Sequence, residues 1–460
     1  MFRTMLIFGL FMVLLLFLPA AGQTTWDAVR LRSMEAGWDA RLMAMGGNGV
    51  ATANSVSALY WNPAGLAQTR QTSLAAEFSH FGLQNSSAFS GNLSEMENTF
   101  TRFRAFGMTF PLPTSRGSLV FGFAYQFVKD LDDYTYFEGF NPNSNDLAFE
   151  LEDQNGAFDW HPFDRNVFQR EEISSNGGLH NWSFGGAVAL SPNFDVGLTL
   201  NFWGGKEEYL FHFYQEDVDD YYNQYPADYF SYRLNRQLNT RLKGFSLKLG
   251  GFFKINPALR VGVGIETPTY LDITEEYSSR DELVFDDGYS DPYESTPGEW
   301  HYRVKTPYRF DAGVALLSRL ATLTGAVRFT DWTQTRFEKP GDAWMDDDYA
   351  DLLAENQYFD KEFRTTMNYH LGGELYLGKS QVILRGGYAY YPTPLKNAEK
   401  ELDREIYGGG IGFQAGQNVM LNFTYLKGNW DRFSEDNLTP GGTMEQLSAQ
   451  KLFIGLEYSF

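Results

Sequence analysis

The sequence predicts an all-β protein: a transmembrane antiparallel β-barrel of about fourteen strands with an N-terminal plug, or hatch, in its lumen. Three observations predict this fold. The chain begins like an exported protein, many stretches alternate between large apolar and small or polar side chains, and the connections between these stretches alternate between short and long. No Pro/Ser-rich linker or charge run divides the 460 residues, so one large closed unit fits better than several soluble domains.

Composition supports a barrel and excludes several other classes. Aromatic residues make up 17% of the chain and glycine occurs 45 times, as expected where aromatic girdles mark two membrane interfaces. The net charge of -21 argues against a nucleic-acid partner, since phosphate binding draws on clustered Lys and Arg. Because the chain has no cysteine, it forms no disulfide, thiolate zinc site or lipid-modified cysteine.

The first element, residues 1–22, reads as a secretory signal peptide. Arg3 precedes an apolar run from Met5 to Leu18, and small residues follow, so we expect cleavage after Ala21 or Gly22. The alternative is an uncleaved helical anchor. Fourteen apolar residues are too few for this, because a spanning helix needs about 20.

The barrel, residues 71–460, is predicted from alternation. The clearest strand is the last, where Leu452, Ile454, Leu456, Tyr458 and Phe460 share one face. Fourteen strands are expected near residues 71–82, 101–110, 118–128, 177–190, 194–204, 238–255, 259–272, 301–317, 320–337, 363–378, 381–392, 404–415, 418–428 and 446–460. An even number places both ends of the barrel on the periplasmic side. We expect contact with outer-membrane lipids, and recognition of the strand ending at Phe460 by the barrel-assembly machinery.

The connections give an independent indication of topology, because bacterial barrels have short periplasmic turns and longer outside loops. Short turns are expected at residues 111–117, 191–193, 255–258, 318–319, 379–380 and 416–417. Long polar loops are expected at residues 129–176, 205–237, 273–300, 338–362, 393–403 and 429–445.

Residues 23–70 do not have the pattern of a membrane strand. They contain the small-residue run Met45 to Ala53, which allows close backbone packing, and the apolar residues Leu59, Tyr60 and Trp61. A free periplasmic tail would have little use for these apolar side chains, so we expect a plug folded inside the lumen. A cap packed at the periplasmic mouth is the alternative.

One resemblance is specific. The stretch from Arg41 to Ala67 resembles the N-terminal hatch of the FadL-type outer-membrane transport proteins, whose Asn-Pro-Ala motif is matched by Asn62, Pro63 and Ala64, followed by Gly65. Thr306 to Leu316, Val327 to Phe337 and Leu384 to Asn397 resemble mid- and late-barrel strands of that superfamily.

The resemblance implies uptake of hydrophobic molecules such as fatty acids or aromatic compounds through a fourteen-stranded barrel closed by the hatch. It implies capture near the outside loops and release through a side opening, formed by an inward kink in the third strand. Gly122 is the one residue of the expected third strand suited to a kink. The long outside loops are acidic, in contrast to an apolar capture groove. A PorV-like branch of the superfamily instead serves protein secretion.

Chemistry other than transport has little support. The six histidines show no HExxH or paired spacing, so no zinc site or other cofactor is expected. Ser174 and His180 are the nearest approach to a nucleophile and base, but the segment fits an ordinary turn better. Acidic clusters such as Asp346 to Asp348 could bind calcium but lack EF-hand spacing. We expect no enzyme.

Several charged residues fall on the lumen side by alternation, because charge facing lipid at mid-depth costs about 2–4 kcal/mol. They are Arg260, Glu266, Asp311, Arg328 and Arg385. We expect them to pair with one another or with the plug. Arg328 and Arg385 are also candidates to bind a ligand carboxylate.

The leading hypothesis is outer-membrane transport of hydrophobic or amphipathic small molecules, with Asn62 to Gly65 shaping the hatch. The alternative is a PorV-like component of secretion or surface attachment that binds proteins through its outside loops. Tyr- and Asp-rich stretches at residues 212–237 and 284–293 hint at this role, because Tyr is favoured at protein contacts. An open diffusion pore is a third possibility, which the plug weakens.

Overall fold

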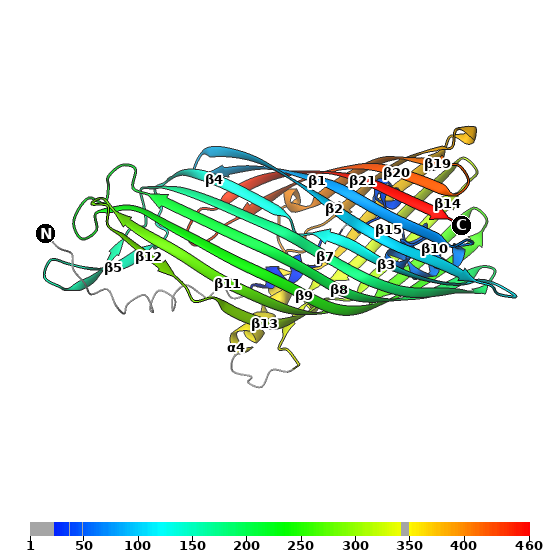
Figure 1. The fold of residues 1–460 in the computed structure, drawn as a ribbon, viewed down its shortest axis with the longest axis horizontal. Coiled ribbons are helices and arrows are strands. Elements are labelled where there is room, and N and C mark those ends of the chain that lie inside the picture. The colour runs from blue at the N-terminus through cyan, green and yellow to red at the C-terminus, as the bar shows by residue number, and fades with distance from the viewer. Residues whose placement is uncertain (1–22, 36, 48, 342–348) are drawn as a thin grey trace.

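The structure is a computed structural model that describes residues 23–460 except residues 36, 48 and 342–348. The expected signal peptide lies outside the described residues. Fourteen antiparallel strands form one ring (Figure 1), closed where β1 pairs with β21. The strands are β1 (Ser73–Phe89), β2 (Asn92–Leu112), β3 (Leu119–Asp130), β7 (Val167–Ser191), β8 (Phe194–Glu216), β9 (Tyr229–Asn256), β10 (Leu259–Glu266), β14 (Arg309–Leu317), β15 (Ala321–Asp331), β17 (Thr365–Tyr376), β18 (Val382–Tyr391), β19 (Arg404–Ala415), β20 (Val419–Ser434) and β21 (Thr443–Ser459). The predicted barrel is confirmed.

The expected outside loops are only partly loops. Most of residues 129–176, 205–237 and 273–300 are strand, so the prediction of long polar loops there is wrong. The additional strands are β4 (Asp133–Asn141), β5 (Ala148–Glu152), β6 (Phe158–Pro162), β11 (Tyr270–Phe285), β12 (Ser290–Glu294), β13 (Gly298–Lys305) and β16 (Arg336–Glu338). β11 continues along β9 beyond β10. The apolar alternation stops where the strands leave the membrane, because their outer face then meets water, but the strands themselves continue.

A belt of exposed apolar side chains surrounds the ring. Phe184, Leu198, Leu249, Leu323 and Ile454 point outward and are 41–60% exposed. An apolar surface of this size would be unfavourable in water. It therefore faces hydrocarbon, and the barrel spans a membrane. None of the described helices is long and apolar enough to cross a membrane.

Aromatic residues edge this belt at the end away from the short turns, which is the outer end. On neighbouring strands, the rings of Phe103 and Tyr125 are 6.1 Å apart, those of Tyr125 and Trp182 are 5.4 Å apart, and those of Phe202 and Phe245 are 5.4 Å apart. We call these five residues the outer girdle. They mark the outer membrane interface.

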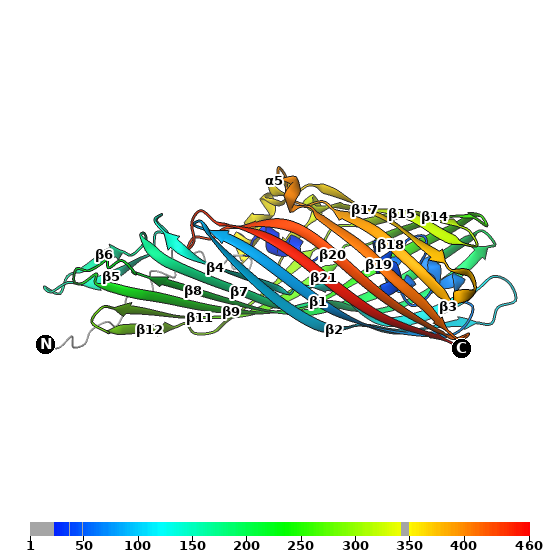
Figure 2. The same ribbon diagram turned by 90° about the horizontal axis from the view of Figure 1, so that it is seen from above.

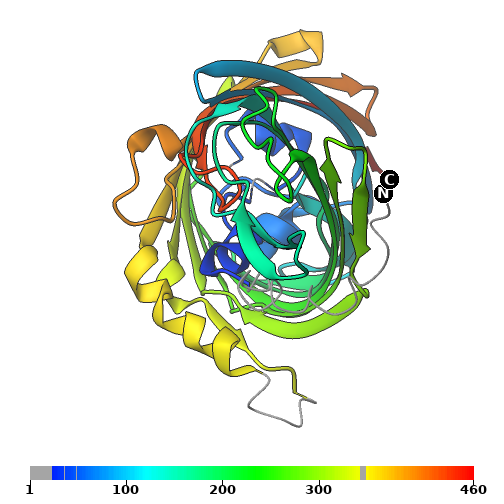
Figure 3. The same ribbon diagram turned by 90° about the vertical axis from the view of Figure 1, so that its left-hand side faces the viewer.

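Residues 23–70, here called the N-terminal segment, lie within the ring, where Figure 3 shows their helices in blue. The elements are α1 (Thr25–Arg30), α2 (Ala40–Ala44), α3 (Ala58–Trp61) and the 3-10 helix η2 (Pro63–Gln68). Thr24 and Asp27 form a capping box on α1, and Asp39 accepts hydrogen bonds from the backbone of α2. Leu42, Leu59 and Leu66 are completely buried.

A connection outside the ring covers one side of the barrel, visible as yellow helices in Figure 3. The short helices between the later strands are η3 (Trp332–Gln334), α4 (Ala350–Ala354), η5 (Glu355–Gln357), α5 (Phe359–Glu362), η6 (Gly378–Ser380) and η7 (Lys400–Leu402). At the end of α5, Phe363 stacks on Trp26 with 6.4 Å between ring centroids. This connection therefore contacts the N-terminal segment.

The wall is much taller on one side than on the other (Figure 2). β9 has 28 residues, whereas β18 has 10. The tall side has its own core inside the wall, here called the outer core. It comprises Leu147, Phe149, Phe163, Val167, Phe211, Phe213, Tyr229, Tyr232, Leu234, Leu283, Phe285 and Leu438. This packing fills the wall interior beyond the membrane.

Candidate functional site

The N-terminal segment touches the wall through glycines. At the positions of the glycine collar, an added Cβ would come within 3.0 Å of the segment. The collar comprises Gly107, Gly185, Gly197, Gly250, Gly262, Gly372, Gly387, Gly408 and Gly410. At Gly262, Gly372 and Gly387 the nearest atoms belong to the segment's backbone, which cannot move aside as a side chain can. The barrel and the segment therefore fit without room for a side chain between them.

The Asn-Pro-Ala-Gly sequence lies at the centre of this contact. The Asn62 side chain is buried, and its Nδ2 donates to the backbone oxygens of Val50 at 2.8 Å and Gly251 at 3.1 Å. Its Oδ1 accepts from Ala64 N at 3.2 Å, which caps η2, and Pro63 is the first residue of that helix. Gly65 lies against the backbone of Ala53. Asn62 thus joins two parts of the N-terminal segment to the wall.

Buried ion pairs also join the segment to the barrel. Arg32 contacts Glu35 at 2.7 Å and Glu266 of β10 at 2.9 Å, and Arg309 of β14 contacts Glu35 at 3.0 Å. The Tyr60 hydroxyl donates to Glu35 at 2.6 Å. Glu266 faces the lumen as expected, and its partner comes from the N-terminal segment.

Both arginines predicted as ligand-binding residues are already paired. Arg328 binds Asp311 at 2.7 Å, and Lys248 contacts the same carboxylate at 3.0 Å. Arg385 binds Glu374 at 3.0 Å. A ligand carboxylate would have to displace Asp311 or Glu374 to reach either guanidinium group.

A separate cavity of about 270 Å³ lies in the lumen between α1, the bend after β3 and the short wall. We call it the lumen cavity. Its apolar lining includes Trp26, Met34, Phe81, Leu83, Val128, Leu426, Trp430 and Leu447, and its cations are Arg30, Lys129, Arg404, Arg432 and Lys451. Asp130, Asp132 and Asp133 are its carboxylates. The cavity combines apolar walls with an excess of positive charge.

Arg404 differs from the other cations of the lumen cavity. Its guanidinium carbon lies 4.1 Å from the centroid of the Trp430 ring, a cation–π contact. The buried Nε of Arg404 and the indole nitrogen of Trp430 have no hydrogen-bond partner among the described residues. Such groups normally have partners, so two neighbouring donors in a cavity indicate a place for an acceptor. The sequence prediction missed Arg404, although alternation with Glu405 and Tyr407 places it on the lumen side.

Beside the lumen cavity, two neighbouring parts of the wall stop pairing with each other. β2 and β3 pair from Leu112↔Leu119 to Ala105↔Gln126, while the rest of β2 pairs with β1 only. After a bulge between Phe127 and Lys129, the chain continues as β4, which pairs with β7. We call this separation the β2–β4 gap. Gly122, the one residue of this strand suited to a kink, lies within the paired part of β3, away from the gap.

Ion pairs span the β2–β4 gap at the end where β2 and β3 stop pairing. Arg102 Nε donates to Asp132 at 3.1 Å, and Arg104 contacts Asp130 at 2.7 Å. Farther along, β4 lies against the inner side of the β1–β2 hairpin, where Asn85 donates to the backbone oxygen of Tyr134 at 2.9 Å. Side-chain contacts therefore connect the two edges of the gap where backbone pairing stops.

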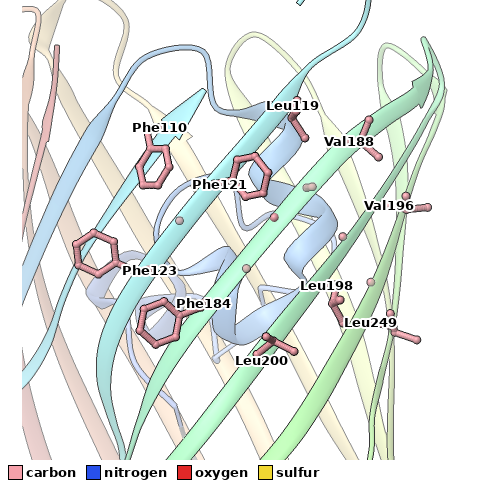
Figure 4. Close-up of a pocket in the computed structure, with 16 residues that line it drawn as sticks. Phe110, Leu119, Phe121, Phe123, Phe184, Val188, Val196, Leu198, Leu200 and Leu249 are labelled. Atoms are coloured by element: carbon pink, nitrogen blue, oxygen red, sulfur yellow. The ribbon is translucent and has the colours of Figure 1, made fainter. Parts of the chain in front are cut away.

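A second hollow lies on the lipid side of the wall. Its volume is about 940 Å³. Figure 4 shows its lining residues on β2, β3, β7, β8 and β9. Its labelled lining residues are Phe110, Leu119, Phe121, Phe123, Phe184, Val188, Val196, Leu198, Leu200 and Leu249. Gly185, Gly197 and Gly250, on the same strands, contact the N-terminal segment from the other side. Here a single layer of backbone separates the segment from the membrane.

Ser174 and His180 cannot act together as nucleophile and base. Both belong to β7, and six residues of extended strand separate them by about 20 Å. The ring of His180 instead lies 5.3 Å from that of Tyr125 at the outer interface. Among the described residues, no group of three or more His, Asp or Glu side chains is arranged to hold a metal ion.

Comparison with known proteins identifies the fold. No family model and no curated protein matches the sequence. Among solved structures, a FadL homologue of Pseudomonas aeruginosa is 13% identical, with a TM-score of 0.59 over 92% of this chain and 98% of that one. The toluene transporter TodX of Pseudomonas putida is 11% identical, with a TM-score of 0.58 over 92% and 99%. The toluene transporter TbuX of Ralstonia pickettii is 13% identical, with a TM-score of 0.54 over 93% and 99%.

Proposed function

We propose that this chain, which has the fold of the FadL-type outer-membrane channels, carries amphipathic small molecules with an acidic head group across the bacterial outer membrane. The observation that carries this proposal is the lumen cavity. It lies beside an opening in the wall, is mostly apolar, and contains Arg404, whose buried Nε has no hydrogen-bond partner among the described residues. Ligand sites typically combine an apolar lining with a few placed polar groups.

The unpaired donors favour an acid over a neutral hydrocarbon. A ligand carboxylate could accept hydrogen bonds from Arg404 Nε and from the Trp430 indole nitrogen, which have no other partner in the described structure. Its hydrocarbon part would lie against residues such as Phe81, Leu426 and Leu447. A purely apolar ligand such as an aromatic hydrocarbon would leave both donors unsatisfied, which costs about 1–3 kcal/mol per group.

The N-terminal segment would act as the plug of this channel. The glycine collar and the bonds of Asn62 leave no room beside it, so a ligand in the lumen cavity reaches the periplasm only if the segment rearranges or the ligand leaves through the wall. The β2–β4 gap is the candidate side opening, since it borders the cavity at Lys129 to Asp133. Entry along the tall side is opposed by the packed outer core.

Binding and uptake of dodecanoate and toluene test the ligand class. We expect Arg404→Gln to weaken dodecanoate binding by about tenfold or more, since a hydrogen bond to a charged group contributes about 1.5–3 kcal/mol. Toluene entry should not change. Lys400→Gln, an exposed cation four residues earlier, is the matched control. Equal dodecanoate binding by Arg404→Gln and wild type would contradict an acidic ligand.

Replacing Asn62 and Pro63 tests the plug separately. These changes remove bonds that hold the N-terminal segment against β9, so we expect altered entry of dodecanoate without altered binding in the lumen cavity. Unchanged entry of every compound tried would reject a gating role.

Protein secretion remains the second candidate function. The tip of the tall side exposes Phe158, Trp160, Tyr221 and Tyr225, which are side chains suited to a protein contact. Part of the Tyr-rich stretches also serves packing, because Tyr229 and Tyr232 are buried in the outer core. Copurification of secreted proteins with the barrel, together with blocked export but normal dodecanoate uptake in its absence, would favour this alternative.

A further inference from the structure

A row of cations lies on the outer face of the tall wall, directly above the outer girdle. On β9 the outward positions beyond Phe245 are Lys243 and Arg241. In the sheet, Lys243 is opposite Asp272 of β11, and Asp272 is opposite Arg303 of β13. Arg241 is opposite Lys206 of β8. In a chain of net charge -21, four cations on neighbouring strands form a local exception.

Three of these cations, Arg241, Lys243 and Arg303, line a hollow of about 500 Å³ between the wall and residues 340–341, which follow β16. Its lining is Arg241, Lys243, Asp272, Thr274, His301, Arg303, Pro340 and Gly341. Arg303 contacts Asp272 at 2.7 Å and Arg241 contacts Glu276 at 2.7 Å. Within the described part of the chain, Lys243 and Lys206 make no ion pair. Among the described residues that line the hollow, the three cations Arg241, Lys243 and Arg303 outnumber the one carboxylate, Asp272.

The opposite side of the barrel has no such row. Above the girdle, the outward positions of β2 include Glu95, Glu97 and Thr101, and those of β21 include Gln450. On β20, Lys427 follows Tyr425 on the outward face. Lys427 is thus a single cation among these positions, whereas the cations on β8, β9 and β13 are neighbours in the sheet.

We propose that this hollow binds the phosphate groups of a phosphorylated glycolipid in the outer leaflet. The outer girdle marks the interface where lipid head groups begin, and the cations lie immediately beyond it. Lys and Arg clusters at this level attract anionic head groups, and the planar guanidinium group suits phosphate oxygens. Asp272 of β11 holds the Arg303 side chain by an ion pair beside the hollow.

Lipid retention by the purified full-length barrel tests the proposal. The probes are bisphosphorylated lipid A and the same lipid after enzymatic removal of its phosphates, with bound lipid counted by native mass spectrometry. We expect wild type to retain the phosphorylated form preferentially. Lys243→Gln should weaken retention about fivefold, and Arg241→Gln with Lys243→Gln by more than about tenfold, since each cation near an anionic surface contributes about one factor of five.

Lys427→Gln is the matched control, because it removes an exposed cation at a comparable height on the other side. Equal retention of both lipid forms by wild type would overturn the proposal, as would the same loss in Lys427→Gln as in Lys243→Gln. If millimolar inorganic phosphate displaces lipid A completely, the hollow is a free-anion site and the lipid assignment is wrong. Circular dichroism of each variant excludes misfolding as the cause of lost binding.

Discussion

The N-terminal segment's surroundings and the lumen cavity contain buried cations in two different arrangements. Around the segment, Arg32, Arg309, Arg328 and Arg385 each contact a carboxylate of the protein. In the lumen cavity, Arg404 instead lies on the Trp430 ring, and its Nε has no hydrogen-bond partner among the described residues. A buried charge without a partner is costly. We therefore assign the paired arginines to holding the segment in place, and Arg404 to the ligand of the proposed function.

The largest effect should come from breaking a paired cluster. Asp311→Ala leaves Lys248 and Arg328 buried without their shared carboxylate. We expect the free energy of unfolding in detergent micelles to fall by about 3–5 kcal/mol, as when one partner of a buried ion pair is removed. Arg404→Gln removes no carboxylate's partner and should change it by less than about 1 kcal/mol. Similar losses in the two variants would mean that Arg404 is also structural.

A second test displaces the N-terminal segment without removing any charge. Gly262→Leu places a side chain against the backbone of Val50, and overpacking of this kind costs about 1–3 kcal/mol. We expect trypsin to cleave at Arg32 or Arg41 about tenfold faster, a change that corresponds to about 1.4 kcal/mol. Gly409→Leu is the control, because an added Cβ there meets nothing within 4 Å. Equal cleavage of both variants would show that the glycine collar does not hold the segment.

A buried carboxyl group without an ion-pair partner among the described residues, Asp281, lies beside the outer core, in contrast to the cation Arg404. Burial raises the pKa of Asp281 from 3.8 to about 6, although the Tyr232 hydroxyl donates to it at 3.3 Å. Because this pKa is higher in the folded protein than in the unfolded chain, the folded state binds the proton more tightly. Its contribution to stability is therefore complete below about pH 4 and is lost as the pH rises through about 6.

Asp281→Asn should remove this pH dependence. We expect the variant and wild type to be equally stable at pH 4, and the variant to be more stable at pH 8 by about 1–2 kcal/mol. The shift of roughly two pKa units corresponds to about 3 kcal/mol, and solvent screening of this partly exposed group lowers that value. Hydrogen exchange of the β11 amides at both pH values measures the difference. A variant that is less stable at pH 8 would show that the carboxylate has a partner in solution.

Sequence reasoning located the strands because lipid imposes a pattern on them. Stretches such as Arg404–Ala415 alternate in a way that water-facing strands need not, and so the extensions of β7, β8 and β9 were missed. The pairing of Arg328 with Asp311 depends on which residues face one another across β14 and β15, and no single-strand pattern contains that register. Arg404 was missed for a related reason. It differs from the other arginines because its Nε has no hydrogen-bond partner among the described residues, and partners are known only once the strands are placed side by side.

The unpaired edge of β2 affects how neighbouring barrels in the membrane can contact one another. An open strand edge usually invites another chain to add to the sheet. From Asn92 to Phe103 this edge meets no strand but β1 on its other side. Two copies aligned antiparallel about Met96 would place Glu95 of each opposite Glu97 of the other, and facing like charges repel. In this register the same acids that make the surface polar therefore oppose pairing of two barrels edge to edge.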